Sequence, residues 1–166
     1  MAGTTSFDYL FERFYRRIEK DEDFFNYYNV DIAEAVQLAH ERAKGCLIDA
    51  LDRLSSTSNL QVDFSDYDEE IETLGFKTTN KENKLIVDLM FQVYMGRDLA
   101  LLHAFKINFT PSDLSVFSPA NERNSYESII TRLDENNEIA LDDYKSRDRN
   151  TGKLKNTINY SAYEDV

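Results

Sequence analysis

Apolar residues recur every three or four positions along four stretches of the chain, which is the spacing of one helix face. In residues 7–18, the apolar positions are separated by arginines. In residues 31–54, the same spacing continues for about six turns, and Asp31 is placed to cap the first turn. We expect two amphipathic helices here. The second helix should turn inward Ile32, Ala35, Val36, Ala39, Ala43, Cys46, Leu47, Ala50 and Leu54.

Two further helices are predicted in the second half of the chain. Thr79 and Glu82 have the spacing of a capping box, which marks the start of a helix over residues 79–105. Its apolar residues spread over more than one face, so it should be the most buried helix. Ser118 followed by Pro119 marks the start of a fourth helix, although Asn136 and Asn137 weaken its middle. Its inward residues should be Tyr126, Ile129, Ile130, Leu133, Ile139 or Ala140, Leu141 and Tyr144.

Two segments lack the helical pattern. Residues 55–78 form a long acidic connection, in which one helical turn over residues 68–73 is expected. Near the C-terminus, Thr151 and Gly152 predict a turn, after which apolar and polar residues alternate as in an extended strand. The sequence therefore predicts a mainly α protein, with about four antiparallel helices in a bundle over residues 1–146. A long acidic loop and an extended C-terminal arm, residues 147–166, complete it.

The charge is unevenly distributed. The chain has a formal net charge of −12, of which residues 21–80 supply −10, whereas residues 147–160 carry +3. An acidic body disfavours direct binding of nucleic acid, because that binding depends on cations that neutralise phosphates. Opposite charges at the two ends favour docking between copies of the chain or onto a protein partner.

Candidate catalytic and metal-binding residues are few. His40 and His103 are the two histidines and Cys46 is the single cysteine. His40 and Cys46 lie six positions apart on one predicted helix and should point in different directions, so they are not expected to form a nucleophile–base pair. An acidic run could hold a hard cation, but it lacks the glycine of an EF-hand loop. Its members are Asp63, Asp66, Asp68, Glu69 and Glu70.

No phosphate-binding loop, nucleophile elbow or zinc-protease motif occurs in the sequence. We therefore expect no enzymatic activity, catalytic residue, cofactor or metal. No run of apolar residues is long enough to span a membrane, and the N-terminus lacks the pattern of a signal peptide, so no membrane contact is expected.

The order of these segments resembles that of the head–tail connector, or adaptor, proteins of tailed bacteriophage necks. The likeness covers the opening helix of residues 7–18, the helix pair of residues 31–54 and 79–105 with its intervening loop, and the terminal stretch of residues 147–160. It implies a structural virion protein of the neck, made in the cytoplasm of the bacterial host. Such proteins form a ring beneath the portal, a cyclic homo-oligomer that is a dodecamer by resemblance, and have no catalytic residues.

The same resemblance implies three partners besides the chain itself. These are the portal protein, a downstream neck or tail-terminator protein, and DNA that passes through an acidic lumen without specific binding. The C-terminal arm would dock on the portal. Its expected contact residues are Arg147, Arg149, Lys153, Leu154, Lys155, Ile158 and Tyr160.

Two other classes remain open at this point. One is an acidic DNA mimic, an inhibitor whose carboxylates occupy the nucleic-acid cleft of a basic enzyme. The other is a small regulatory enzyme, which would need a pocket with perturbed ionisable groups.

Overall fold

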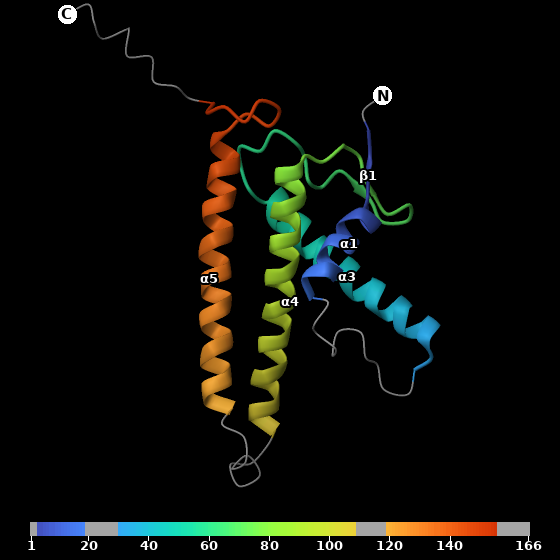
Figure 1. Cartoon of the computed structure of the whole chain (residues 1–166), viewed down its shortest axis with the longest axis vertical. Helices are drawn as coiled ribbons and strands as arrows, with labels where there is room; N and C mark the ends of the chain where they lie inside the picture. The colour runs from blue at the N-terminus through green and yellow to red at the C-terminus, as the bar shows by residue number, and fades with distance from the viewer. Residues whose placement is uncertain (1–2, 19–29, 109–118, 156–166) are drawn as a thin grey trace, which may run out of the picture.

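The computed structural model describes residues 3–18, 30–108 and 119–155, and within them the protein is mainly helical with one small sheet (Figure 1). Helix α4 lies between α5 on one side and α1 and α3 on the other. The helices are α1 (Phe7–Ile18), α3 (Ile32–Ser55), α4 (Asn80–Asn108) and α5 (Pro119–Ser146), and the strands are β1 (Thr5–Ser6), β2 (Tyr67–Asp68) and β3 (Thr73–Leu74).

The helix starts predicted from local signals are confirmed. Asp31 Oδ1 accepts a hydrogen bond of 2.9 Å from the Glu34 backbone N–H, which caps α3. At the start of α4, the Thr79 N–H donates to Glu82 Oε2 at 2.6 Å and the Glu82 N–H donates to Thr79 Oγ1 at 3.3 Å. Both halves of the predicted capping box are therefore formed. Pro119 is the first residue of α5, the helical position that proline favours.

The main core lies where α1 packs against α3 and α4. The five apolar residues of α1, namely Phe7, Leu10, Phe11, Phe14 and Ile18, are at most 3% exposed. The inward face of α3 is confirmed from Ala39 onward, but Ile32 and Val36 are 84% and 65% exposed, so their prediction as inward residues is wrong. The first turns of α3, where the helix keeps its apolar spacing, extend away from the other described helices (Figure 1).

Helix α5 runs antiparallel to α4 and is joined to it by a polar layer. The Asn137 side chain is 4% exposed and donates to Gln92 Oε1 at 2.7 Å, and Gln92 donates to Asp134 Oδ1 at 2.8 Å. Arg53 of α3 also donates to Gln92 Oε1 at 3.0 Å. The middle of α5 is thus held by partly buried hydrogen bonds at Asn137, one of the two asparagines expected to weaken it. Of the alternatives Ile139 and Ala140, Ala140 is the one that packs against the core, since Ile139 is 69% exposed. Ile129 was also predicted to face inward and is exposed, so that prediction is wrong.

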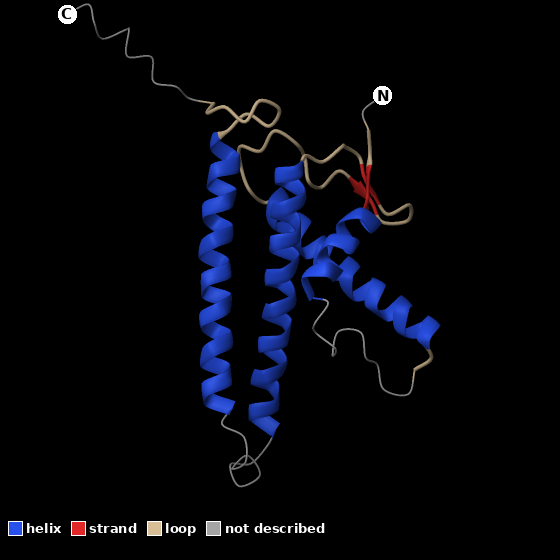
Figure 2. Cartoon of the chain, viewed as in Figure 1, coloured by secondary structure: helices blue, strands red, loops and turns tan. Residues whose placement is uncertain are grey.

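The acidic connection of residues 55–78 folds onto the body as part of an antiparallel sheet of order β1-β3-β2 (Figure 2). The helical turn expected over residues 68–73 is wrong. Asp68 Oδ1 instead accepts from the Glu70 and Ile71 N–H groups at 2.8 and 3.1 Å, which closes the β2–β3 turn. Phe64 and Leu74 are fully buried in this connection. The Asp66 carboxylate lies against Gly75, so a side chain at position 75 would require the exposed Asp66 side chain to move.

Among the helices in the described ranges, none combines the length and the apolar character of a membrane span.

Candidate functional site

Residues 147–155 form a closed turn at the end of α5, and the prediction of an extended arm is wrong for this part of the chain. The Gly152 N–H donates to the Asp148 carbonyl at 2.8 Å, and the Asp148 N–H donates to the Lys153 carbonyl at 2.7 Å. Gly152 has a φ of 69°, which suits glycine, so the turn predicted at Thr151 and Gly152 is confirmed. The rest of the expected arm, residues 156–166, lies outside the described residues.

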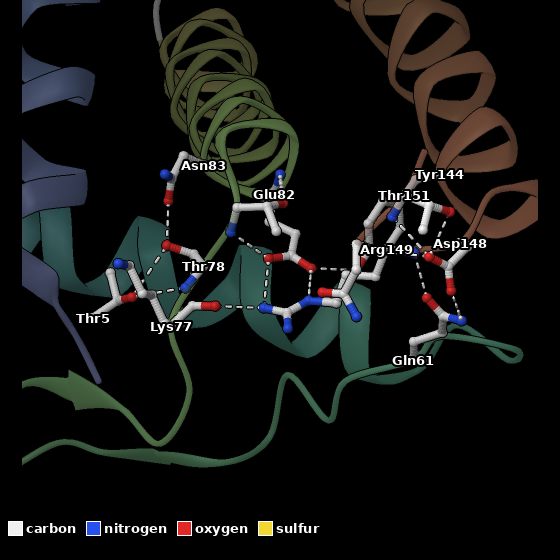
Figure 3. A network of polar contacts seen from close by, with 12 residues as sticks. Thr5, Gln61, Lys77, Thr78, Glu82, Asn83, Tyr144, Asp148, Arg149 and Thr151 are labelled. Atoms are coloured by element: carbon white, nitrogen blue, oxygen red, sulfur yellow. Dashed lines mark hydrogen bonds and ion pairs between the residues drawn. The ribbon is translucent and has the colours of Figure 1, made fainter. Parts of the chain in front are cut away.

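The centre of this site is an ion pair between Arg149 and a fully buried carboxylate (Figure 3). Arg149 Nε donates to Glu82 Oε1 at 2.5 Å, and Nη2 donates to Glu82 Oε2 at 3.0 Å. The Glu82 side chain is 0% exposed and the Arg149 side chain 18%. Tyr144 Oη donates to Glu82 Oε1 at 2.5 Å. Because Glu82 also completes the capping box of α4, one carboxylate joins the start of α4, the end of α5 and the turn.

Further contacts join the turn of residues 147–155 to the acidic connection of residues 55–78. The Arg149 N–H donates to Gln61 Oε1 at 2.5 Å, and Gln61 Nε2 donates to Asp148 Oδ2 at 3.3 Å. Arg149 Nη2 also donates to the Lys77 carbonyl, and its guanidinium lies 5.6 Å from the centre of the Phe76 ring. We call residues Gln61, Glu82, Tyr144, Asp148 and Arg149 the C-terminal clasp.

The clasp holds its carboxyl groups in the ionised form. Burial alone raises the pKa of Glu82, but the hydrogen bonds from Arg149, Tyr144 and the Thr79 N–H outweigh it, so the pKa lies below its usual value. Hydrogen bonds from the Thr151 N–H and hydroxyl, and from Gln61, lower the pKa of Asp148 to about 2. Burial and the neighbouring Glu82 carboxylate raise the pKa of Tyr144, which keeps its hydroxyl a donor.

Acid is therefore expected to destabilise the clasp. Both carboxyl groups have a lower pKa when folded than when unfolded, so their contribution to stability is complete above about pH 4.5. It is lost as the pH falls toward their folded pKa values. Thermal unfolding measured from pH 6 to pH 2 should show this loss, and Glu82→Gln should give a shallower slope below about pH 4.5. An unchanged slope in that variant would show that Glu82 does not contribute to the pH dependence.

The expected partner-binding residues of the arm have several different environments. Arg147 pairs with Asp143 at 2.6 Å and Arg149 with Glu82, both within the same chain. Lys153, Leu154 and Lys155 are exposed, with Leu154 at 52%. Ile158 and Tyr160 lie outside the described residues. Arg149 therefore anchors the segment to its own body, while a partner-binding role for the exposed residues stays a prediction.

Sequence reasoning found Glu82 as a helix cap but missed its role in the clasp. The capping box is a local signal, whereas the partner Arg149 lies 67 positions away in the sequence. Gln61 carries no signal at all, since a single glutamine in a polar stretch is typical of any exposed loop.

The candidate catalytic residues are not brought together. Cys46 is 1% exposed in the core, which fits its interpretation as a small hydrophobic residue. His40 lies at the surface of α3 against Glu72, with its Nε2 atom 2.9 Å from Glu72 Oε2. In the described ranges, one set of side chains has the spacing of metal ligands: Asp8, His40 and Glu72. The acidic run of residues 63–70 forms no such set there.

The chain matches no protein-family model, no curated protein sequence and no solved structure.

Proposed function

We propose that this protein is a structural virion protein, a head–tail connector that forms a ring beneath the portal and docks on it through its C-terminal segment. The observation that carries this proposal is the position of the clasp. It fixes residue 155, the last described residue, at the end of the helix pair where α4 begins and α5 ends, while the last turn of α4 and the first turn of α5 lie at the opposite end (Figure 1). A connector has to contact one neighbour on each of two opposite faces.

The clasp changes which residues belong to the docking segment. Because Arg149 is bound to a buried carboxylate of its own chain, the docking segment begins after it, with the exposed Lys153, Leu154 and Lys155. The clasp supports docking, because it fixes the point from which the docking segment starts. A segment that starts from a fixed point loses less conformational entropy on binding than one that follows a flexible hinge.

The surface charge supports both the formation of a ring and a central channel to which DNA does not bind. The carboxylates of the acidic run, residues 63–70, are exposed, as are Lys153 and Lys155. Head-to-tail packing of identical copies brings such unlike surfaces together and closes a ring. An acidic lumen repels the phosphates of a passing DNA molecule.

Truncation after Lys155 tests the part of the docking segment that follows Lys153, Leu154 and Lys155, namely residues 156–166. This variant keeps the clasp, so its unfolding temperature should match that of the full chain, but it should no longer copurify with the portal protein of the same phage. Mass measurement of the full chain with that portal should show a closed ring. A truncated protein that still bound the portal with full affinity would remove the docking role of residues 156–166.

Truncation after Tyr144 is the matched comparison. It also removes Arg149 and leaves the Glu82 carboxylate buried without its cation, so it should lower stability as well as binding. Loss of portal binding in this variant alone would therefore report on the body and not on the docking segment.

The exposed carboxylates of residues 63–70 favour a second candidate function, an acidic DNA mimic that inhibits a basic enzyme. This function predicts a chain that does not assemble with portals and that binds a basic nucleic-acid enzyme with strong salt dependence. Mass measurements in the presence of each partner distinguish the two functions.

A further inference from the structure

Three side chains from three different elements converge beside the start of α1. Asp8 lies in the first turn of α1, His40 on α3 and Glu72 in the β2–β3 turn, and their ligand atoms all lie within 4.8 Å of one another. The backbone sets this convergence. The Phe7 N–H donates to the Glu72 carbonyl at 2.8 Å, which fixes the turn against the residue next to Asp8.

The imidazole of His40 is oriented by contacts on two sides. Its Nε2 atom lies 2.9 and 3.1 Å from the two Glu72 carboxylate oxygens. The ring of Phe11, which is 2% exposed, packs against it edge-on with 5.0 Å between ring centres. One ring nitrogen is thus held facing the Glu72 carboxylate.

The charges at this position leave room for a further cation. Lys44 Nζ donates to Glu72 Oε1 at 3.1 Å and to the Glu69 carbonyl at 2.7 Å. Lys44 therefore balances Glu72. The Asp8 carboxylate, in contrast, accepts no hydrogen bond from any residue in the described ranges. Two carboxylates with one ammonium group leave one negative charge unbalanced beside a histidine nitrogen.

We propose that Asp8, His40 and Glu72 bind a divalent transition-metal ion of the zinc type. Bonds of about 2.0–2.2 Å place tetrahedral ligand atoms roughly 3.4 Å apart, which small side-chain movements reach from the observed spacing. An imidazole nitrogen with two carboxylates suits zinc and its neighbours, whereas calcium and magnesium favour oxygen ligands alone. Lys44 moves off Glu72 when the ion binds and keeps its bond to the Glu69 carbonyl. Water molecules complete the coordination of the ion.

Calorimetric titration of the full chain with Zn²⁺ at neutral pH tests this site. We expect saturable binding of one ion, weakened at least tenfold by His40→Ala and by Asp8→Asn. Lys44→Met should strengthen binding, because it removes the competing ammonium group. Absorption of bound Co²⁺ should indicate a nitrogen ligand in the full chain and lose that signature in His40→Ala.

Two matched variants test whether Zn²⁺ binds at this site and not through the general negative charge of the surface or through the second histidine. Glu70→Gln removes a neighbouring exposed carboxylate outside the set, and His103→Ala removes the other histidine. Both should bind Zn²⁺ as the full chain does. The site is overturned if no saturable binding occurs, if His103→Ala abolishes it, or if Glu70→Gln weakens it as much as Asp8→Asn does. Should circular dichroism show that His40→Ala does not fold, Asp8→Asn at an exposed position and Lys44→Met at a partly exposed one decide the question.

Discussion

Replacing Arg149 with alanine should lower the free energy of unfolding by about 3–5 kcal/mol, because it leaves the fully buried Glu82 carboxylate without its cation. For a chain of this length, the loss corresponds to a fall in unfolding temperature of about 6–20 °C. Thermal and urea unfolding followed by circular dichroism measure it. The effect is large because Glu82 also holds Tyr144 and the first turn of α4.

Arg147→Ala is the matched control, since it removes an arginine two positions away with a different partner. Arg147 pairs with Asp143, four residues earlier, and both side chains are partly exposed. Such surface pairs contribute about 0–1 kcal/mol. Equal effects of the two substitutions would show that water replaces Arg149 at Glu82, and that the clasp does not stabilise the body.

A double variant separates the cost of a buried charge from the loss of contacts. Glu82→Gln removes the charge, so adding it to Arg149→Ala should recover part of the lost stability. The Tyr144 hydroxyl keeps an acceptor in the glutamine oxygen. Recovery would identify the unpaired carboxylate as the main cost.

The helices could be predicted from the sequence because their signals are local. Asp31, Thr79 and Pro119 mark helix starts within one turn, and the apolar face of α1 is complete within 12 residues. A helix closes its hydrogen bonds between residues four positions apart, so a short window of sequence contains the necessary information. The exposure of residues at the helix ends was harder to predict, since Ile32 fits the apolar pattern of α3 yet is 84% exposed.

The sheet and the clasp could not be predicted, because their partners are far apart along the chain. Thr5 pairs with Leu74, and Arg149 with Glu82, with nothing in either local sequence to identify the other. Each two-residue strand is also too short for alternation to be recognised. The basic composition of residues 147–160 predicted docking on an acidic surface of another copy or of a protein partner, and this stays a prediction. The carboxylate that Arg149 binds in the structure, that of Glu82, belongs to its own chain.

The buried residues of the acidic connection show why composition alone was misleading there. Phe64 and Leu74 are fully buried, whereas the carboxylates of residues 63–70 are exposed. Charged residues dominate the count, but a few apolar positions decide where the backbone lies, because their burial supplies most of the stabilising free energy. A connection with the composition of a solvated loop is in this way packed on the body, with Phe64 against Tyr144 of α5.

Phe64→Ala should therefore destabilise the protein by about 3–5 kcal/mol, although it lies in the most acidic part of the chain. The Phe64 ring meets Phe76 edge-on at 5.5 Å between ring centres and Tyr144 at 6.4 Å, so its loss opens a cavity beneath the clasp. Unfolding in urea measures the loss, and faster amide exchange at residues 60–76 should accompany it. Ile71→Ala in the same connection is the control, because Ile71 is 69% exposed and its truncation should change stability by no more than about 0.5 kcal/mol. If the two substitutions had equal small effects, the connection would not be packed on the body. The clasp would then lack the aromatic support that positions Tyr144 toward Glu82.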